Sequence, residues 1–167
     1  SLSGIPGKLF ISPEYCLLRD RQKLIIRPAG SIARMPGTEV YIDADVTHMH
    51  HPIPLSIERL KLPDDFRPDT DPRIASLDMA MVHYPLILRK WKKGDFFQPF
   101  GMKHTKKLSD FFIDEKFSVF EKQDSWVLES GGKIAWLVGH RSDERFRITD
   151  RTRDILRIKW LSELPAE

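Results

Sequence analysis

The chain has 167 residues, of which 41% are hydrophobic and 31% charged, a composition typical of one globular domain with at most a small appendage. The net charge is only +3, but most Arg and Lys lie in the C-terminal part, so we expect a locally anionic partner. The single cysteine, Cys16, excludes an internal disulfide, and no run reaches the roughly 18 apolar residues of a membrane span. We therefore expect a cytoplasmic protein that makes no membrane contact.

Short alternating segments fill the first part of the chain and predict a small antiparallel meander. The expected strands cover residues 8–11, 15–19, 23–27, 38–42 and 54–60. In the last of these strands, the alternation places Leu55 and Ile57 on one face. Because the chain begins with Ser1 and not with methionine, we expect it to be a part of a longer protein.

A polar, acidic segment with three prolines follows at residues 63–73 and predicts a long loop or a linker. It divides the chain into a β-rich lead-in over residues 1–62 and a domain over residues 74–160. The first residues of that domain, 74–81, have an apolar pattern that fits a helix and a strand equally well.

The signals are sharper after Pro85. Residues 86–91 predict a strand, residues 92–95 a turn, and residues 96–103 an irregular loop rich in Pro and Gly. We expect a helix from an N-cap at Thr105 to about Lys116, because apolar residues recur there at helical spacing.

The C-terminal part predicts a hairpin and two further strands. Residues 126–138 alternate around Gly131 and Gly132, which supply the positive φ that a tight hairpin turn needs. Residues 145–148 and 155–160 predict strands. Strands outnumber helices without alternating regularly with them, so we predict an α+β fold, with antiparallel or mixed β-sheets and a few short helices.

Two patterns could carry chemistry, but neither is complete. The histidines His48, His50 and His51 have metal-ligand spacing, yet no neighbouring cysteine or acidic cluster completes a site. Ser130 and the two glycines resemble the start of a phosphate-binding loop, but a strand follows them where such a loop needs a helix. We therefore predict no catalytic residue and no metal site in this chain.

The strongest functional signal is a basic stretch at residues 89–107, which holds seven Arg and Lys residues against one acid, Asp95. Trp91, Phe96 and Phe97 lie among these charges and could stack on bases, although we expect two of the three in the core. A second basic group spans residues 141–159 and is rich in arginine, whose planar fork suits phosphate. A basic patch of this kind indicates a polyanion-binding surface or, alternatively, a solvated face.

Ordered motifs in this region resemble one protein family. They read RKWKKGDF at 89–96, PFGMK at 99–103, KKLSDFFID at 106–114 and IAWLVGHR at 134–141. Together they resemble the C-terminal domain of tRNA(Ile)-lysidine synthetases over about residues 74–160, and the segment around residues 7–26 resembles the lead-in to that domain. His140 departs from the family pattern, where many relatives carry a hydrophobic or small residue.

The resemblance implies an enzyme that uses ATP and Mg²⁺ to adenylate the wobble cytidine of an isoleucine tRNA and then joins lysine to it, giving lysidine. It further implies that catalysis belongs to an N-terminal domain not contained in this sequence. This chain would then be the non-catalytic part that holds the tRNA, on its acceptor-stem side. The expected tRNA contacts are Arg89, Lys92, Lys93, Lys103, Lys106, Lys107, Arg141 and Arg145.

Three alternatives stay open. The basic face could dock on an acidic protein partner or on the N-terminal domain of the same protein. Exposed strand edges could pair two copies into a homodimer. A stand-alone enzyme is the least supported alternative, because no catalytic constellation is complete.

Overall fold

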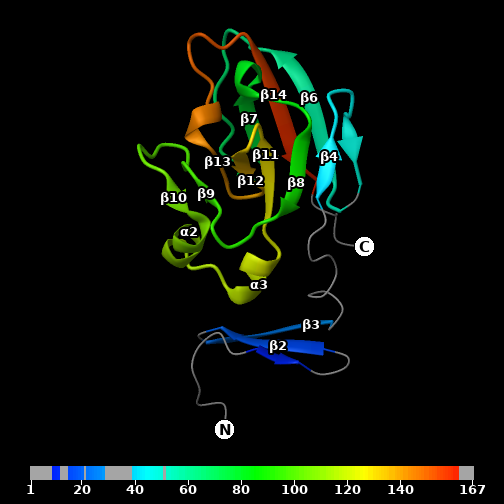
Figure 1. The fold of residues 1–167 in the computed structure, drawn as a ribbon, viewed down its shortest axis with the longest axis vertical. Coiled ribbons are helices and arrows are strands. Elements are labelled where there is room, and N and C mark those ends of the chain that lie inside the picture. The colour runs from blue at the N-terminus through cyan, green and yellow to red at the C-terminus, as the bar shows by residue number, and fades with distance from the viewer. Residues whose placement is uncertain (1–8, 12–14, 21, 29–38, 51, 162–167) are drawn as a thin grey trace.

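The computed structural model describes residues 9–11, 15–20, 22–28, 39–50 and 52–161, which form an α+β fold dominated by antiparallel sheets (Figure 1). A four-stranded sheet has the order β5-β6-β14-β7. Its strands are β5 (His48–Met49), β6 (Leu55–Lys61), β7 (Ile74–Asp78) and β14 (Asp154–Trp160). A five-stranded sheet has the order β13-β12-β11-β8-β4. Its strands are β4 (Val40–Ile42), β8 (Leu86–Lys90), β11 (Trp126–Ser130), β12 (Lys133–Leu137) and β13 (Arg141–Ser142).

The main core lies between these two sheets. Leu55 and Ile57, which share one face of β6 as predicted, are buried and belong to the same cluster as Leu88 and Leu128 of the five-stranded sheet. β11 is buried on both faces, because Val127, between Trp126 and Leu128, belongs to a second cluster. The sequence of a strand that is buried on both faces is a continuous apolar run, without the alternation of a half-buried strand.

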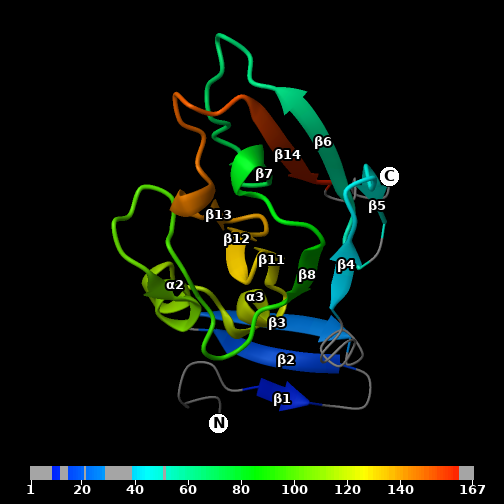
Figure 2. The same ribbon diagram turned by 45° about the horizontal axis from the view of Figure 1, so that its top comes forward.

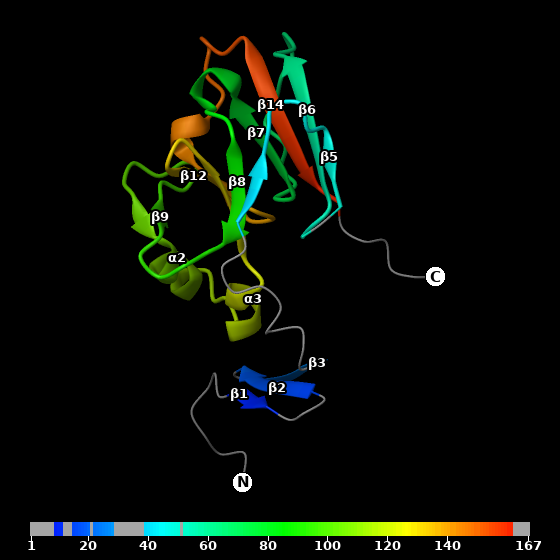
Figure 3. The ribbon, with the colours of Figure 1, turned by 45° about the vertical axis from the view of Figure 1, so that its right-hand side comes forward.

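A third layer covers the other face of the five-stranded sheet. It contains β9 (Phe96–Phe97), β10 (Lys106–Lys107) and α2 (Leu108–Asp114). In Figures 1 and 3, β8 and β12 lie between this layer and the strands β6 and β14. α2 buries Leu108, Phe111 and Phe112 against β11 and β12, as its helical spacing predicted.

The start of α2 differs from the prediction. The helix does not begin at Thr105, because Lys106 and Lys107 pair with β9 as a short strand before the helix starts. Lys107 occupies the N-cap position and makes no side-chain cap hydrogen bond. The strand pairing satisfies local backbone groups that a longer helix would otherwise have used.

A second helix, α3 (Val119–Gln123), was missed by the sequence analysis. A capping box begins it: the Ser118 hydroxyl accepts from the Glu121 amide, and the Glu121 carboxylate accepts from the Ser118 amide. α3 contacts a separate meander of β1 (Leu9–Ile11), β2 (Tyr15–Asp20) and β3 (Lys23–Pro28), which lies below it in Figure 2. Arg27 of β3 forms an ion pair with Asp124, and its guanidinium lies 5.0 Å from the ring centroid of Phe120.

The predicted meander is right for β1 to β3 and wrong beyond them. β4 pairs with β8, and β6 pairs with β14, so the lead-in segment supplies strands to both large sheets. Alternation identifies a strand but not its distant partner. The division of the chain at residues 63–73 stays a prediction, and strands from both sides of that segment pair within the same sheets.

Two smaller predictions also changed. The ambiguous residues 74–81 form β7 followed by the 3₁₀ turn η1 (Met79–Met81). The strand predicted at residues 145–148 is wrong, because the 3₁₀ turn η2 (Glu144–Phe146) begins there under an Asp143 cap. No helix in the described part of the chain has the length and hydropathy needed to cross a bilayer.

Candidate nucleic-acid interface

The turn between β8 and β9 is organised around Asp95. The Asp95 carboxylate accepts a hydrogen bond of 2.8 Å from the Lys92 amide, and the Asp95 amide donates one of 3.1 Å to the Lys92 carbonyl. Gly94 has a φ of +96°, a backbone conformation that would be strained for a residue with a side chain. This closed turn leaves the side chains of Lys92 and Lys93 exposed.

Arg89 supports this turn from inside the fold. It is only 7% exposed, and its two terminal nitrogens donate to the two Asp95 oxygens at 2.8 and 3.0 Å. Its Nε donates to Glu129 at 2.9 Å. Burial acts to lower the pKa of Arg89, but the hydrogen bonds and charges of both carboxylates outweigh it and raise the pKa above its ordinary value. The expected tRNA contact Arg89 is therefore buried and paired with two carboxylates, whereas the other expected contacts are at least partly exposed.

A second buried carboxylate, Asp143, fixes the loop that follows β9. Asp143 is fully buried and accepts from the Gln98 amide at 2.8 Å. It also accepts two hydrogen bonds, of 2.9 and 2.8 Å, from the Arg145 guanidinium, and these bonds raise the pKa of Arg145. Glu144 accepts from the Gly101 amide at 2.8 Å, so the loop at residues 98–102 is tied to η2 at both ends.

The short ladder of β9 and β10 arranges aromatic and basic side chains in pairs. Lys107 lies opposite Phe96, and Lys106 lies opposite Phe97. Phe97 is fully buried, whereas Phe96 is 54% exposed beside the exposed Lys107. Lys106 is only partly exposed and forms an ion pair with Asp114. The ladder therefore presents to solvent the ring of Phe96 and one cation, Lys107, that forms no ion pair among the described residues.

The expected division of the aromatic residues between core and surface is confirmed. Trp91 packs edge-on against Phe112, with ring centroids 4.9 Å apart, and its indole N–H donates to the Lys122 carbonyl. Phe97 joins the same second core. Of the three candidate stacking residues, Phe96 is the one that stays exposed.

A pocket brings several predicted residues together with one that the sequence analysis missed. It lies between the β8–β9 turn and the start of β12, and it is lined by Arg89, Gly94, Asp95, Phe96, Gly132, Lys133, Ile134 and Arg145. Lys133 is exposed at this pocket. The sequence clue to Lys133 is its position directly after Gly131 and Gly132. In the structure these glycines have φ values of +57° and +79°, so Lys133 lies at the tip of the hairpin.

The basic side chains of this surface fall into two classes. The arginines are held by acids: Arg89 and Arg145 as described above, and Arg141 4.0 Å from Glu115 and 5.5 Å from the Phe111 ring centroid. Among the exposed lysines that form no ion pair with a carboxylate of the described residues, five lie in the β8–β9 turn, the loop after β9, β10 and the start of β12. We call these five the lysine rim: Lys92, Lys93, Lys103, Lys107 and Lys133.

The chemistry that this arrangement supports is anion binding. Ammonium groups on ordered turns attract phosphates, and an exposed aromatic ring offers a stacking face to a base. Among the described residues, no group of three or more His, Cys, Asp or Glu side chains could hold a metal ion. His48 contacts the Thr47 hydroxyl at 3.2 Å, and His51 lies outside the described residues.

Comparisons with known proteins agree on one family. Residues 86–160 match the family described as the TilS substrate C-terminal domain. The tRNA(Ile)-lysidine synthase of Parabacteroides distasonis is 44% identical over 161 residues, which are 96% of this chain and 36% of the relative. The tRNA(Ile)-lysidine synthase of Bacteroides thetaiotaomicron is 36% identical over 93% of this chain and 33% of the relative. The chain thus spans about a third of the length of these relatives.

A solved structure shares the fold. The crystal structure of a TilS C-terminal domain superposes with a TM-score of 0.60 and 22% identity. The superposition covers 75% of this chain and all of that domain.

Proposed function

We propose, from the premise that residues 86–160 belong to the TilS substrate C-terminal domain family, that this chain is the tRNA-binding part of a tRNA(Ile)-lysidine synthase. The observation that carries the proposal is the lysine rim, whose five exposed lysines form no ion pair among the described residues. Lys107 lies opposite the exposed ring of Phe96, and Lys133 lines the same pocket as that ring. Lysine ammonium groups bind phosphates as mobile point charges, and here buried carboxylates fix the turn that carries Lys92 and Lys93 and the loop that leads to Lys103.

The rim suits the outside of an RNA stem. An A-form helix has a deep, narrow major groove, so side chains reach its phosphates, 2′-hydroxyls and shallow minor groove. Binding through the rim is then led by phosphates and selects shape over sequence. We assign the stem to the acceptor side of an isoleucine tRNA, with Lys106, Arg141 and Arg145 at the margin of the contact.

The proposal extends to the chemistry of the whole enzyme. A catalytic domain elsewhere in the protein uses ATP, Mg²⁺ and free lysine, and this chain positions the tRNA for that domain. The relatives are named as tRNA(Ile)-lysidine synthases, which supports a ligase acting on tRNA.

Binding of labelled tRNA, followed by fluorescence anisotropy, tests the proposal. The variant Lys92→Ala/Lys93→Ala/Lys133→Ala removes three rim charges, and the control Lys61→Ala/Arg151→Ala/Lys159→Ala removes three exposed charges from outside the rim. At about 0.2–1 kcal/mol for each exposed charge pair, the rim variant should weaken binding roughly 3- to 150-fold, and the control should change it little.

Two results would contradict the proposal. The first is equal loss in the two variants, which would trace binding to net charge alone. The second is the absence of tRNA binding at low salt together with capture of an acidic protein, which would favour the alternative of a protein-docking face.

A further inference from the structure

A second pocket lies where the two large sheets meet at their edges. β7 is an edge strand of the four-stranded sheet, and β13 is an edge strand of the five-stranded sheet. The pocket between them has a volume of about 510 Å³, open solvent at its mouth included. Of this space, about 100 Å³ can hold the centre of a water-sized molecule, so the pocket is small.

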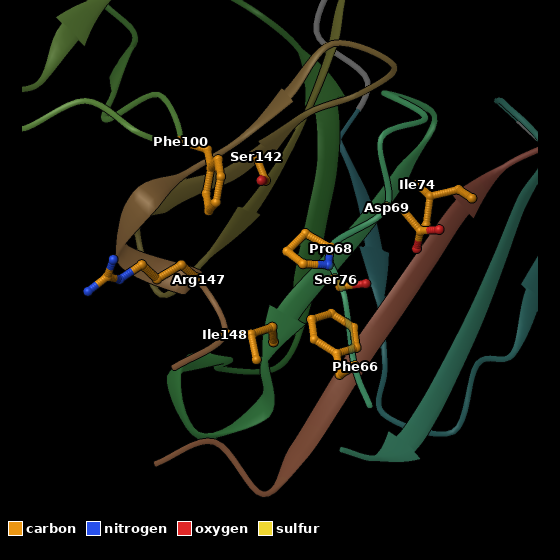
Figure 4. Close-up of a pocket in the computed structure, with 9 residues that line it drawn as sticks. All are labelled: Phe66, Pro68, Asp69, Ile74, Ser76, Phe100, Ser142, Arg147 and Ile148. Carbon is orange, nitrogen blue, oxygen red and sulfur yellow. The ribbon is translucent and has the colours of Figure 1, made fainter. Parts of the chain in front are cut away.

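The floor of this pocket contains an unused polar group. Ala75 and Leu77 of β7 are buried in the main core, so Ser76 between them points to the opposite face and into the pocket (Figure 4). The Ser76 hydroxyl is buried and has no hydrogen-bond partner among the described residues. A buried hydroxyl without a partner costs free energy, which a ligand that hydrogen-bonds to it would recover.

The walls of the pocket are apolar and its edges are charged. Phe66 and Pro68 come from the loop after β6, and Phe100 faces them from the loop after β9 (Figure 4). Asp69 is partly exposed and lies 3.4 Å from Arg157. The side chain of Arg147 is 56% exposed at the outer edge, 3.2 Å from Glu144.

We propose that this pocket binds one unpaired nucleobase of an RNA strand that leaves a stem held on the lysine rim. Phe100 offers its ring as the stacking surface, and Pro68 and Phe66 close the opposite wall. Ser76 and Asp69 accept hydrogen bonds from amino groups on the edge of the base, and Arg147 pairs with the adjoining phosphate.

The link to the rim is the loop at residues 98–102. This loop carries Phe100 into the pocket and leads directly to Lys103 of the rim, and it is anchored by Asp143 and Glu144. One ordered segment therefore spans the phosphate-binding surface and the base pocket. The inference rests on the proposed function, because the rim must hold the stem before a neighbouring base can enter the pocket.

Two RNA hairpins with the same stem test this inference. One is blunt, and the other carries a single unpaired nucleotide, placed in turn at the 3′ and the 5′ end and with each of the four bases. We expect one of the overhangs to bind the wild-type chain about 5- to 150-fold more tightly than the blunt stem, the range that stacking of one base on an aromatic ring gives. The preferred base should carry an amino group on its pairing edge.

Three variants separate the pocket from the rim. Phe100→Ala removes the stacking surface, Ser76→Val fills the floor, and Ile113→Ala removes an exposed apolar side chain from α2 as a control. The first two should abolish the overhang advantage and leave blunt-stem affinity unchanged, and the control should keep both.

Each other outcome has a definite meaning. Equal binding of the blunt and overhang hairpins by the wild-type chain would overturn the base pocket and leave the proposed function standing. An overhang advantage that survives Phe100→Ala and Ser76→Val, or an equal loss of blunt-stem binding in these variants, would also overturn it. Binding of neither hairpin would overturn the proposed function itself.

Discussion

Arg89 donates two hydrogen bonds, 2.8 and 3.0 Å long, to the two carboxylate oxygens of Asp95, directly beneath the turn that carries Lys92 and Lys93. The two kinds of cation in one basic stretch therefore have different roles. The arginine is buried and paired, so its charge stabilises the turn. The lysines are exposed, and among the described residues they have no acidic partner, so their charge is available to an anion.

The first prediction concerns this buried ion pair. Arg89→Met removes the shared partner of Asp95 and Glu129 and leaves two carboxylates without a counter-charge. Breaking a buried pair in this way costs about 3–5 kcal/mol of the free energy of unfolding. Urea denaturation followed by circular dichroism measures the loss. The double variant Arg89→Met/Asp95→Asn should lose less than the sum of its two single variants, and strict additivity would contradict the pairing.

The second prediction compares two glycines with positive φ. Gly94→Ala introduces backbone strain of about 1–2 kcal/mol at φ +96°, but a Cβ there meets no atom within 4 Å. Gly139→Ala adds a steric clash to similar strain, because its Cβ would lie 2.6 Å from the ring of Trp160. Thermal unfolding should therefore show a larger loss for Gly139→Ala. The reverse order would mean that the turn at Gly94 is more tightly constrained than its open surroundings indicate.

The third prediction concerns the anchored loop. Asp143→Asn removes the charge that holds Arg145 and weakens the acceptor of the Gln98 amide. The free energy of unfolding should fall by about 1–3 kcal/mol. Hydrogen exchange at the Gln98 and Gly101 amides should become faster than in the control Asp150→Asn, whose side chain is exposed. Unchanged exchange at Gln98 would show that the loop does not depend on Asp143.

The sequence predicted local elements well because their signals are local. The hairpin around Gly131 and Gly132 follows from the need for positive φ, and the buried face of α2 follows from the spacing of Leu108, Phe111 and Phe112. The capping box of Ser118 and Glu121 was equally visible in the sequence, and it would have revealed α3.

Long-range pairing could not be predicted in the same way. The alternation of residues 54–60 predicts a strand, but it does not indicate that this strand, β6, pairs with β14, about a hundred positions later. The contrast between Arg89 and Lys92 was also hidden, because both are cations in one basic run. Asp95, six residues later in the same stretch, and Glu129 of β11 together hold the arginine inside the fold.

The salt dependence of tRNA affinity tests most directly the claim that the lysine rim binds phosphates. Each phosphate that a lysine neutralises releases counterions, so the dependence of affinity on salt measures how many phosphates are bound. If the five lysines of the rim each meet one phosphate, the slope of log K against log[salt] should be about −3.5 to −4.5. Lys92→Ala/Lys93→Ala should make the slope shallower by roughly 1.4–1.8, and the control Lys61→Ala/Lys159→Ala should leave it unchanged. A slope that Lys92→Ala/Lys93→Ala does not alter would contradict the account and place these lysines on a merely solvated face.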